Sequence, residues 1–331
     1  MSAATSNAIN GPIPEPVPVP ASASVPGAAS GLVLALVSAA SFSTSGTFAR
    51  SLGDAGWTPG AAVTARISGA ALVLLVPALV ALRGRWHLLR RSAGTIAIYG
   101  LVTIAGCQLC YFNAVARLSV GVALLLEYLG IVLIVGYLWL RYGKRPQRLT
   151  LIGSVVALAG LALVIDVLGG AHLDPIGILW ALGGAVGLAT YFVISGNTTD
   201  DVPPLVLAGG GMIVGALALV VLGVLDVLPM HAVYGQVSFA GRHAPWWVSV
   251  AGLSLIATTI GYVSGIGAAR RLGPTLASFV GLTEVLFAIL VAWAFLGELP
   301  TGVQLVGGVL IIGGVALVRI DEGRRAARSA G

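Results

Sequence analysis

Charged side chains are scarce in this chain of 331 residues: Asp, Glu, Lys and Arg together make up 9%, whereas hydrophobic residues make up 57%. An ordinary soluble domain is about 25% charged. The mean hydropathy of +0.99 points the same way. This composition excludes an ordinary soluble domain and indicates a protein that lies in a lipid bilayer.

Cysteine and histidine are also few, with two cysteines and four histidines in the whole chain. Two cysteines cannot build a disulfide framework, and Cys107-x-x-Cys110 lacks a second pair of metal ligands. The histidines all fall in loops or at the ends of apolar segments, where none can carry protons in the middle of a membrane: His87, His172, His231 and His243. We therefore expect neither a metal site nor a cofactor.

Several catalytic and nucleotide-binding motifs are absent. The sequence contains no His-Glu-x-x-His, no Gly-x-Ser-x-Gly and no phosphate-binding Gly-x-x-x-x-Gly-Lys-Ser/Thr. These absences argue against an enzyme and against an ATP-driven pump. The net charge of +6 does not indicate nucleic-acid binding either, because the basic residues are scattered in short loops.

Ten apolar windows approach the roughly 20 residues that a helix needs to cross about 30 Å of hydrocarbon. In lipid the backbone must satisfy its own hydrogen bonds, and windows of this length fit helices. The sequence therefore predicts an all-α polytopic membrane protein with ten transmembrane helices, at about 31–49, 59–82, 93–114, 119–140, 149–167, 175–195, 204–225, 246–268, 275–296 and 301–319.

The second half of the chain repeats the first. Residues 117–164 match residues 271–318 at a shift of 154, with 13 of 48 identical, and span 1 matches span 6 at a shift of 146. Each half holds five spans, and because five is odd the second half must be inverted in the bilayer relative to the first. Inverted repeats are typical of secondary transporters. We predict two inverted five-helix repeats, residues 30–170 and 171–319.

The placement of basic residues predicts the orientation. Lys and Arg near span ends stay in the cytoplasm, and a cytoplasmic N-terminus puts fourteen of them inside and only Arg50, Arg117 and Arg242 outside. Residues 1–29 contain six prolines and no Lys or Arg, which is typical of a disordered tail and not of a cleaved signal peptide. Residues 320–331 form a basic cytoplasmic tail. Both termini are therefore expected in the cytoplasm.

Two stretches of the sequence carry a family resemblance. Residues 111–118 (YFNAVARL), and residues 293–298 (WAFLGE) followed by 304–308 (QLVGG), resemble the EamA-type branch of the drug/metabolite transporter superfamily over about residues 31–319. Residues 122–130 (VALLLEYLG) are similar to its threonine and homoserine exporter subgroup. The resemblance implies ten helices, two inverted repeats, a cytoplasmic N-terminus and export of small metabolites. We expect a multi-pass protein of the plasma membrane, which in bacteria is the cytoplasmic membrane.

The sequence departs from this family pattern in two places. Gly143-Lys144 stands where the family often has Gly-Glu, and the proline often found midway along spans 4 and 9 is absent. Both departures concern gating and substrate choice and leave the expected fold unchanged.

Three ionisable residues are expected near the middle of the bilayer. Arg66 in span 2, Glu127 in span 4 and Glu284 in span 9 each lie about 10 to 14 Å from the start of their helix. A charge there costs on the order of 2.5 to 3.5 kcal/mol on insertion scales, and is rarely kept without a role. We therefore take these three residues as the core of a substrate-binding or ion-coupling site.

Two interpretations of these charges stay open at this stage. Arg66 and Glu127 form either a fixed ion pair that locks spans 2 and 4, or part of a site in which Glu284, without an obvious cation partner, takes up a proton. Nearby polar residues either line the same cavity or satisfy helix backbones: Gln108, Tyr111, Asn113, Thr258, Thr259 and Tyr262, together with Ser38, Ser41 and Ser45 of span 1.

The function that these observations favour is secondary transport. We expect export of a small metabolite, above all an amino acid or a related amphiphilic compound, by alternating access between the two halves, with proton coupling as an added possibility. The expected partners are this substrate and the lipid bilayer. The alternatives are a passive facilitator or channel, and a non-transporting intramembrane enzyme.

Overall fold

The computed structural model of the protein describes residues 28–115, 117–118, 120–143, 146–164, 174–197, 202–239, 242–296 and 301–330. Within these ranges, nine helical stretches are long and apolar enough to cross a membrane, and the apolar helix Arg148–Val164 is shorter. All ten coincide with the windows expected from the sequence, so the prediction of an all-α polytopic membrane protein is confirmed. The predicted N-terminal tail lies almost entirely outside the described residues.

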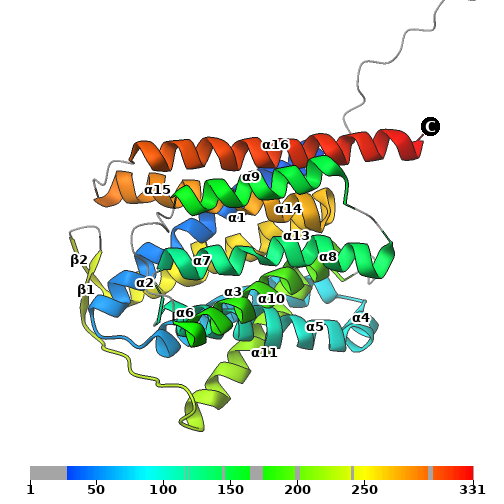
Figure 1. The fold of residues 1–331 in the computed structure, drawn as a ribbon. Coiled ribbons are helices and arrows are strands. Elements are labelled where there is room, and N and C mark those ends of the chain that lie inside the picture. Colours follow the sequence, from blue (N-terminus) through cyan, green and yellow to red (C-terminus); the bar gives the residue numbers. More distant parts are fainter. Residues whose placement is uncertain are drawn as a thin grey trace, which may run out of the picture.

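All ten spans run along one another in a single bundle, and spans of the first half pack chiefly against spans of the second (Figure 1). In chain order, the first five spans are α1 (Ala28–Ser43) with α2 (Ser45–Asp54); α3 (Pro59–Leu82); α5 (Ala93–Ile98) with the π-helix η1 (Tyr99–Gly106) and α6 (Cys107–Val115); α7 (Val120–Tyr128) with α8 (Gly130–Tyr142); and α9 (Arg148–Val164). The short helix α4 (Trp86–Arg91) connects spans 2 and 3.

The second five spans complete the bundle. They are α10 (Pro175–Gly196); α11 (Pro204–Val224); α12 (Trp246–Ala251) with the π-helix η2 (Gly252–Ile260) and α13 (Gly261–Leu272); α14 (Pro274–Gly281) with α15 (Thr283–Leu296); and α16 (Gly302–Ala330). Between spans 7 and 8 lies an antiparallel hairpin that the sequence analysis did not foresee, formed by β1 (Gln236–Phe239) and β2 (Arg242–Pro245). We call this side of the bundle the hairpin end and the opposite side the α4 end (Figure 1).

Local sequence signals explain where several of these helices begin and end. Proline, whose fixed φ suits the first helical position, begins α3, α10, α11 and α14. The side chains of Thr58 and Asp174 accept hydrogen bonds from the first backbone N–H groups of α3 and α10. Gly143 ends α8 with a φ of 64°, a left-handed conformation that favours glycine.

Four spans are interrupted near their middles, at corresponding places in the two halves. Span 4 breaks at Leu129, between α7 and α8, and span 9 breaks at Leu282, between α14 and α15. Spans 3 and 8 contain the π-helices η1 and η2, and in η2 Thr258 and Thr259 donate to carbonyl oxygens five residues earlier, at 2.7 and 2.8 Å. Because π-helical turns and broken membrane helices often mark functional sites, these four interruptions point to the bundle centre.

Several contacts between the two halves occur twice. In the second contact, each residue is replaced by its counterpart from the other half. Glycine pairs bring α9 and α16 into backbone contact, Gly153 against Gly314 and Gly160 against Gly307. At the shift of 154, Gly153 corresponds to Gly307 and Gly160 to Gly314. Gly31 against Leu272 and Gly177 against Leu118 form another such exchanged pair. Corresponding positions of the two halves thus make matching contacts.

The glycine contacts make a prediction about stability. A Cβ added at Gly160 would lie 2.6 Å from the carbonyl oxygen of Gly307, and backbone cannot yield as a side chain can. Gly160→Ala should therefore lower the free energy of unfolding by about 1 to 3 kcal/mol. Gly313→Ala on α16 is the matched control, because nothing lies within 4 Å of its added Cβ. Equal melting temperatures for the two variants in detergent would contradict this packing.

Candidate substrate site at the bundle centre

Arg66 lies on α3 at the bundle centre and is only 5% exposed. Its Nε donates a hydrogen bond to the Thr258 hydroxyl at 2.8 Å, and its terminal nitrogen donates to Ser45 at 3.0 Å and to Gln108 at 3.4 Å. The guanidinium thus contacts spans 1, 3 and 8 through neutral acceptors. Because these acceptors carry no charge, the positive charge of Arg66 remains available to an anionic group.

The contact of Arg66 with Thr258 has an apolar counterpart in the other half. A shift of 145 aligns Arg66 with Gly211, and the shift of 154 aligns Thr258 with Ile104. A Cβ added at Gly211 would lie 3.0 Å from Ile104, so the second pair also touches. The repeat therefore supplies the same contact twice but places polar chemistry in only one copy.

Glu127 lies near the end of α7, two residues before the break in span 4. The Cys107 thiol, at the start of α6, donates to Glu127 Oε1 at 3.3 Å and lies 3.5 Å from the carbonyl oxygen of Gly184. Gly187 permits this approach, because a Cβ there would lie 2.5 Å from that of Cys107. The carboxylate of Glu127 thus faces spans 3 and 6.

Glu284 lies in the first turn of α15, two residues after the break in span 9. The Tyr128 hydroxyl donates to Glu284 Oε2 at 2.9 Å, which joins spans 4 and 9 at their interruptions. The N-terminal end of a helix favours a negative charge through its free N–H groups. Neither Glu284 nor Glu127 forms an ion pair with Arg66 in the described part of the chain, although Glu284 lies close enough for the charge of Arg66 to act on it.

These contacts bear on the two interpretations drawn from the sequence. The described residues show no ion pair between Arg66 and either Glu127 or Glu284, so the proposal that Glu284 takes up a proton stays a prediction. Helix periodicity gave the depth of each residue but not the direction in which its side chain points.

The remaining predicted residues divide into two groups. Gln108 accepts from Arg66, and Tyr111 and Tyr262 lie near Arg66. In contrast, other polar groups donate to backbone carbonyls, as a purely structural role would require: Asn113 to Leu109, Thr259 to Ser254 and Ser38 to Gly261. The second group supports helix geometry more than it builds a site.

Sequence reasoning missed two partners of the carboxylates. Cys107 was considered only as a metal or redox residue, and Tyr128 was not considered at all. Both residues adjoin candidates in the sequence, because Tyr128 directly follows Glu127 and Cys107 precedes Gln108 by one position. Neither position, however, reveals which helix its side chain faces until the packing is known.

Comparisons with known proteins agree with this architecture. A family model described as "EamA-like transporter family" matches residues 29–166 and again residues 175–320. A protein of Streptantibioticus cattleyicolor named a probable terminal-alkyne amino-acid exporter is 31% identical over 240 residues, which cover 71% of this chain and 76% of that protein. The uncharacterized inner membrane transporter YicL of Salmonella typhimurium is 26% identical over 247 residues, covering 72% and 76%.

An archaeal relative and a solved structure extend the comparison. An uncharacterized transporter of Archaeoglobus fulgidus is 26% identical over 222 residues, covering 67% of this chain and 74% of that protein. One crystal structure superimposes with a TM-score of 0.71 at 20% identity, covering 87% of this chain and 96% of that one, which shows a shared fold. The family model covers both halves of the chain almost completely. The protein belongs to the EamA-like transporter family.

Proposed function

We propose that this transporter exports a small amino acid, or a related amphiphilic compound, across the bacterial cytoplasmic membrane by alternating access coupled to protons. The observation that carries the proposal is the set of neutral partners around Arg66. Its buried guanidinium bonds to three neutral acceptors, while Glu127 and Glu284 lie in the same polar cluster. A site with buried charges of both signs complements a zwitterion.

The physical argument rests on the cost of buried charge. A charge in a low-dielectric interior costs several kcal/mol unless a partner and hydrogen bonds compensate it. The carboxylate of an amino acid would supply the missing charged partner of Arg66, and its ammonium group would suit a glutamate. The Streptantibioticus relative, whose printed name is that of an amino-acid exporter, supports this substrate class.

Alternating access follows from the proposal that the halves are inverted repeats. The exchanged glycine contacts support a two-fold relation, and the matched breaks at Leu129 and Leu282 give each half a hinge beside its carboxylate. Two such units can exchange conformations, which opens the site to one side of the membrane and then to the other. Glu284 would carry the proton, since it starts α15 beside one hinge.

The orientation that we propose places the α4 end in the cytoplasm. Most basic residues lie at that end, and Arg117, one of the three expected outside, is paired with Asp174 at 3.4 Å. The backbone N–H of Gly177 and this arginine hold the pKa of Asp174 below its usual range. Pairing with Asp174 offsets the positive charge of Arg117, so this arginine argues less strongly against placing the hairpin end outside.

Cysteine labelling tests the orientation. In a variant without Cys107 and Cys110, a cysteine at the exposed Ser238 of the hairpin should react with an impermeant maleimide added to intact cells. A cysteine at the exposed His87 of α4 should react only after the cells are opened. The reverse pattern would overturn the proposed topology.

Counterflow in proteoliposomes tests the function. Purified protein should exchange at least one member of a panel of labelled amino acids, with saturation, and should accumulate it against a concentration gradient when a proton gradient is imposed. Unsaturable flux would favour the channel, and chemical conversion without exchange would favour the enzyme. Exchange of none of the panel would overturn the proposed substrate class.

A further inference from the structure

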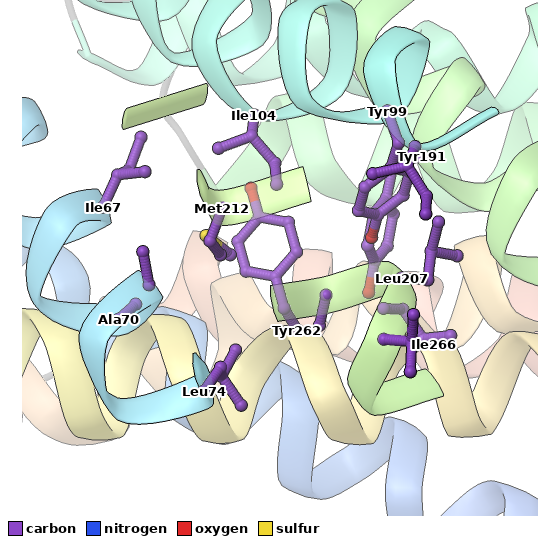
Figure 2. Close-up of a cluster of buried hydrophobic side chains, with 14 of the residues drawn as sticks. Ile67, Ala70, Leu74, Tyr99, Ile104, Tyr191, Leu207, Met212, Tyr262 and Ile266 are labelled. Carbon is purple, nitrogen blue, oxygen red and sulfur yellow. The ribbon is translucent and has the colours of Figure 1, made fainter. Parts of the chain in front are cut away.

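A row of tyrosines leads from the Arg66 site toward the α4 end. Tyr262 packs edge-on against Tyr191 with ring centroids 5.5 Å apart, and Tyr191 lies 6.2 Å from Tyr99 (Figure 2). All three are buried, and they come from three different spans. Counted along their helices, Tyr262 lies about 15 Å from the α4 end, whereas Tyr191 and Tyr99 lie about 8 to 9 Å from it.

Arg270 stands at the end of this row, in the last turn of α13. It lies near Tyr99, whose hydroxyl lies 3.4 Å from Ser195. The Nε atom of Arg270 is buried, and no hydrogen-bond partner is found for it in the described part of the chain. The row therefore joins two guanidinium groups at different depths, Arg66 at the bundle centre and Arg270 at the α4 end.

Tyr191 adds a second unpartnered donor. Its side chain is 6% exposed, and its hydroxyl lies close to Ser38 and Gly265 but forms no hydrogen bond of suitable geometry with any described residue. Leaving a buried polar group unsatisfied costs about 1 to 3 kcal/mol. The row thus holds two buried donors without an acceptor among the described residues, the Tyr191 hydroxyl and the Arg270 Nε. An acceptor group of a substrate would satisfy them.

The groups of the row have no equivalents at the corresponding positions of the repeat. Tyr191 corresponds to Ser45 at the shift of 146, and Arg270 corresponds to Ala116 at the shift of 154. The same asymmetry marks Arg66, whose counterpart is Gly211. Helix packing alone does not require this difference, because the other half packs the corresponding spans without these groups.

We propose that Arg270, with Tyr99 and Tyr191, forms a second binding site for the substrate carboxylate. The substrate occupies this site on its way from the cytoplasm to Arg66. The inference rests on the proposed function and extends it. The guanidinium of Arg270 is the only charged group of the row, and hydroxyls can donate to a carboxylate, so the row suits an anionic group. An amino acid would thus enter with its carboxylate bound first at Arg270 and then at Arg66.

Comparison of an amino acid with its amino alcohol, which lacks the carboxylate, tests this site. The probe is the panel amino acid that the wild type carries best, and Vmax/KM is measured for both compounds in proteoliposomes. Arg270→Gln should lower Vmax/KM of the amino acid about tenfold, the loss expected for one charge-assisted contact, and leave that of the amino alcohol unchanged. Arg271→Gln, at the exposed neighbouring position, is the control and should change neither.

Tyr191→Phe is a second test that holds even if Arg270→Gln folds poorly, since it keeps the ring and removes only the hydroxyl. It should lower Vmax/KM of the amino acid in the same selective way but to a smaller extent. Equal losses for both compounds, or no loss in either variant, would overturn the second site while leaving the proposed function standing. A wild type that carries no amino acid would overturn both.

Discussion

Arg66→Gln is expected to lower amino-acid transport at least about 100-fold, the effect of losing a buried charged partner of roughly 2.7 kcal/mol or more. Glutamine keeps an amide N–H that can bond to a neighbouring acceptor of this set, and no described carboxylate forms an ion pair with Arg66, so the fold should persist. Arg66→Lys should recover only part of the rate, because an ammonium cannot reproduce the planar fork of a guanidinium. Initial rates of counterflow measure both variants.

The control for this prediction is Arg50→Gln, which removes an exposed arginine from α2 and should transport normally. The structural interpretation of Arg66 predicts a different set of results. Stability would fall in Arg66→Gln, and both stability and transport would return in the double variant that also carries Glu127→Gln. That result would show that the charge of Arg66 serves packing and not the substrate.

Glu284→Gln is expected to abolish accumulation driven by a proton gradient while leaving exchange in place. A gradient of one pH unit supplies about 1.4 kcal/mol per proton, enough for about tenfold accumulation by one-to-one exchange. Glutamine resembles the protonated acid permanently, so a variant that cannot release a proton should accumulate nothing. Tyr128→Phe, which removes the hydrogen bond to Glu284, should alter the pH profile of exchange without abolishing accumulation.

Asp54→Asn is the matched control for the carboxylate prediction, because Asp54 is exposed at the end of α2 and should not affect coupling. Wild-type accumulation by Glu284→Gln would show that another group carries the proton. The nearest candidate is then Glu127, and the same measurement on Glu127→Gln would decide between the two carboxylates.

The sequence could predict the spans because hydrocarbon thickness fixes helix length, and ten apolar windows of that length stand out. It could also place Arg66, Glu127 and Glu284 at similar depth, since depth follows from rise per residue. Direction around the helix could not be predicted. Each residue turns a helix by about 100°, so a small boundary error, or one interruption, redirects the side chain.

The interruptions themselves explain most of what was missed. No proline marks the breaks at Leu129 and Leu282, and η2 depends on the hydroxyls of Thr258 and Thr259 reaching carbonyls five residues back. These features redirect the surfaces of spans 3, 4, 8 and 9, which carry most of the site. The hairpin was also missed, because its short strands lie in a segment that reads as a loop.

Equilibrium binding to purified protein tests the central claim most directly, that Arg66 receives the carboxylate of a zwitterionic substrate. The wild type should bind the transported amino acid at least about 100-fold more tightly than its amino alcohol, and Arg66→Gln should bind the two with similar affinity. A wild type that binds both equally, or an Arg66→Gln variant that keeps the full preference, would contradict the account.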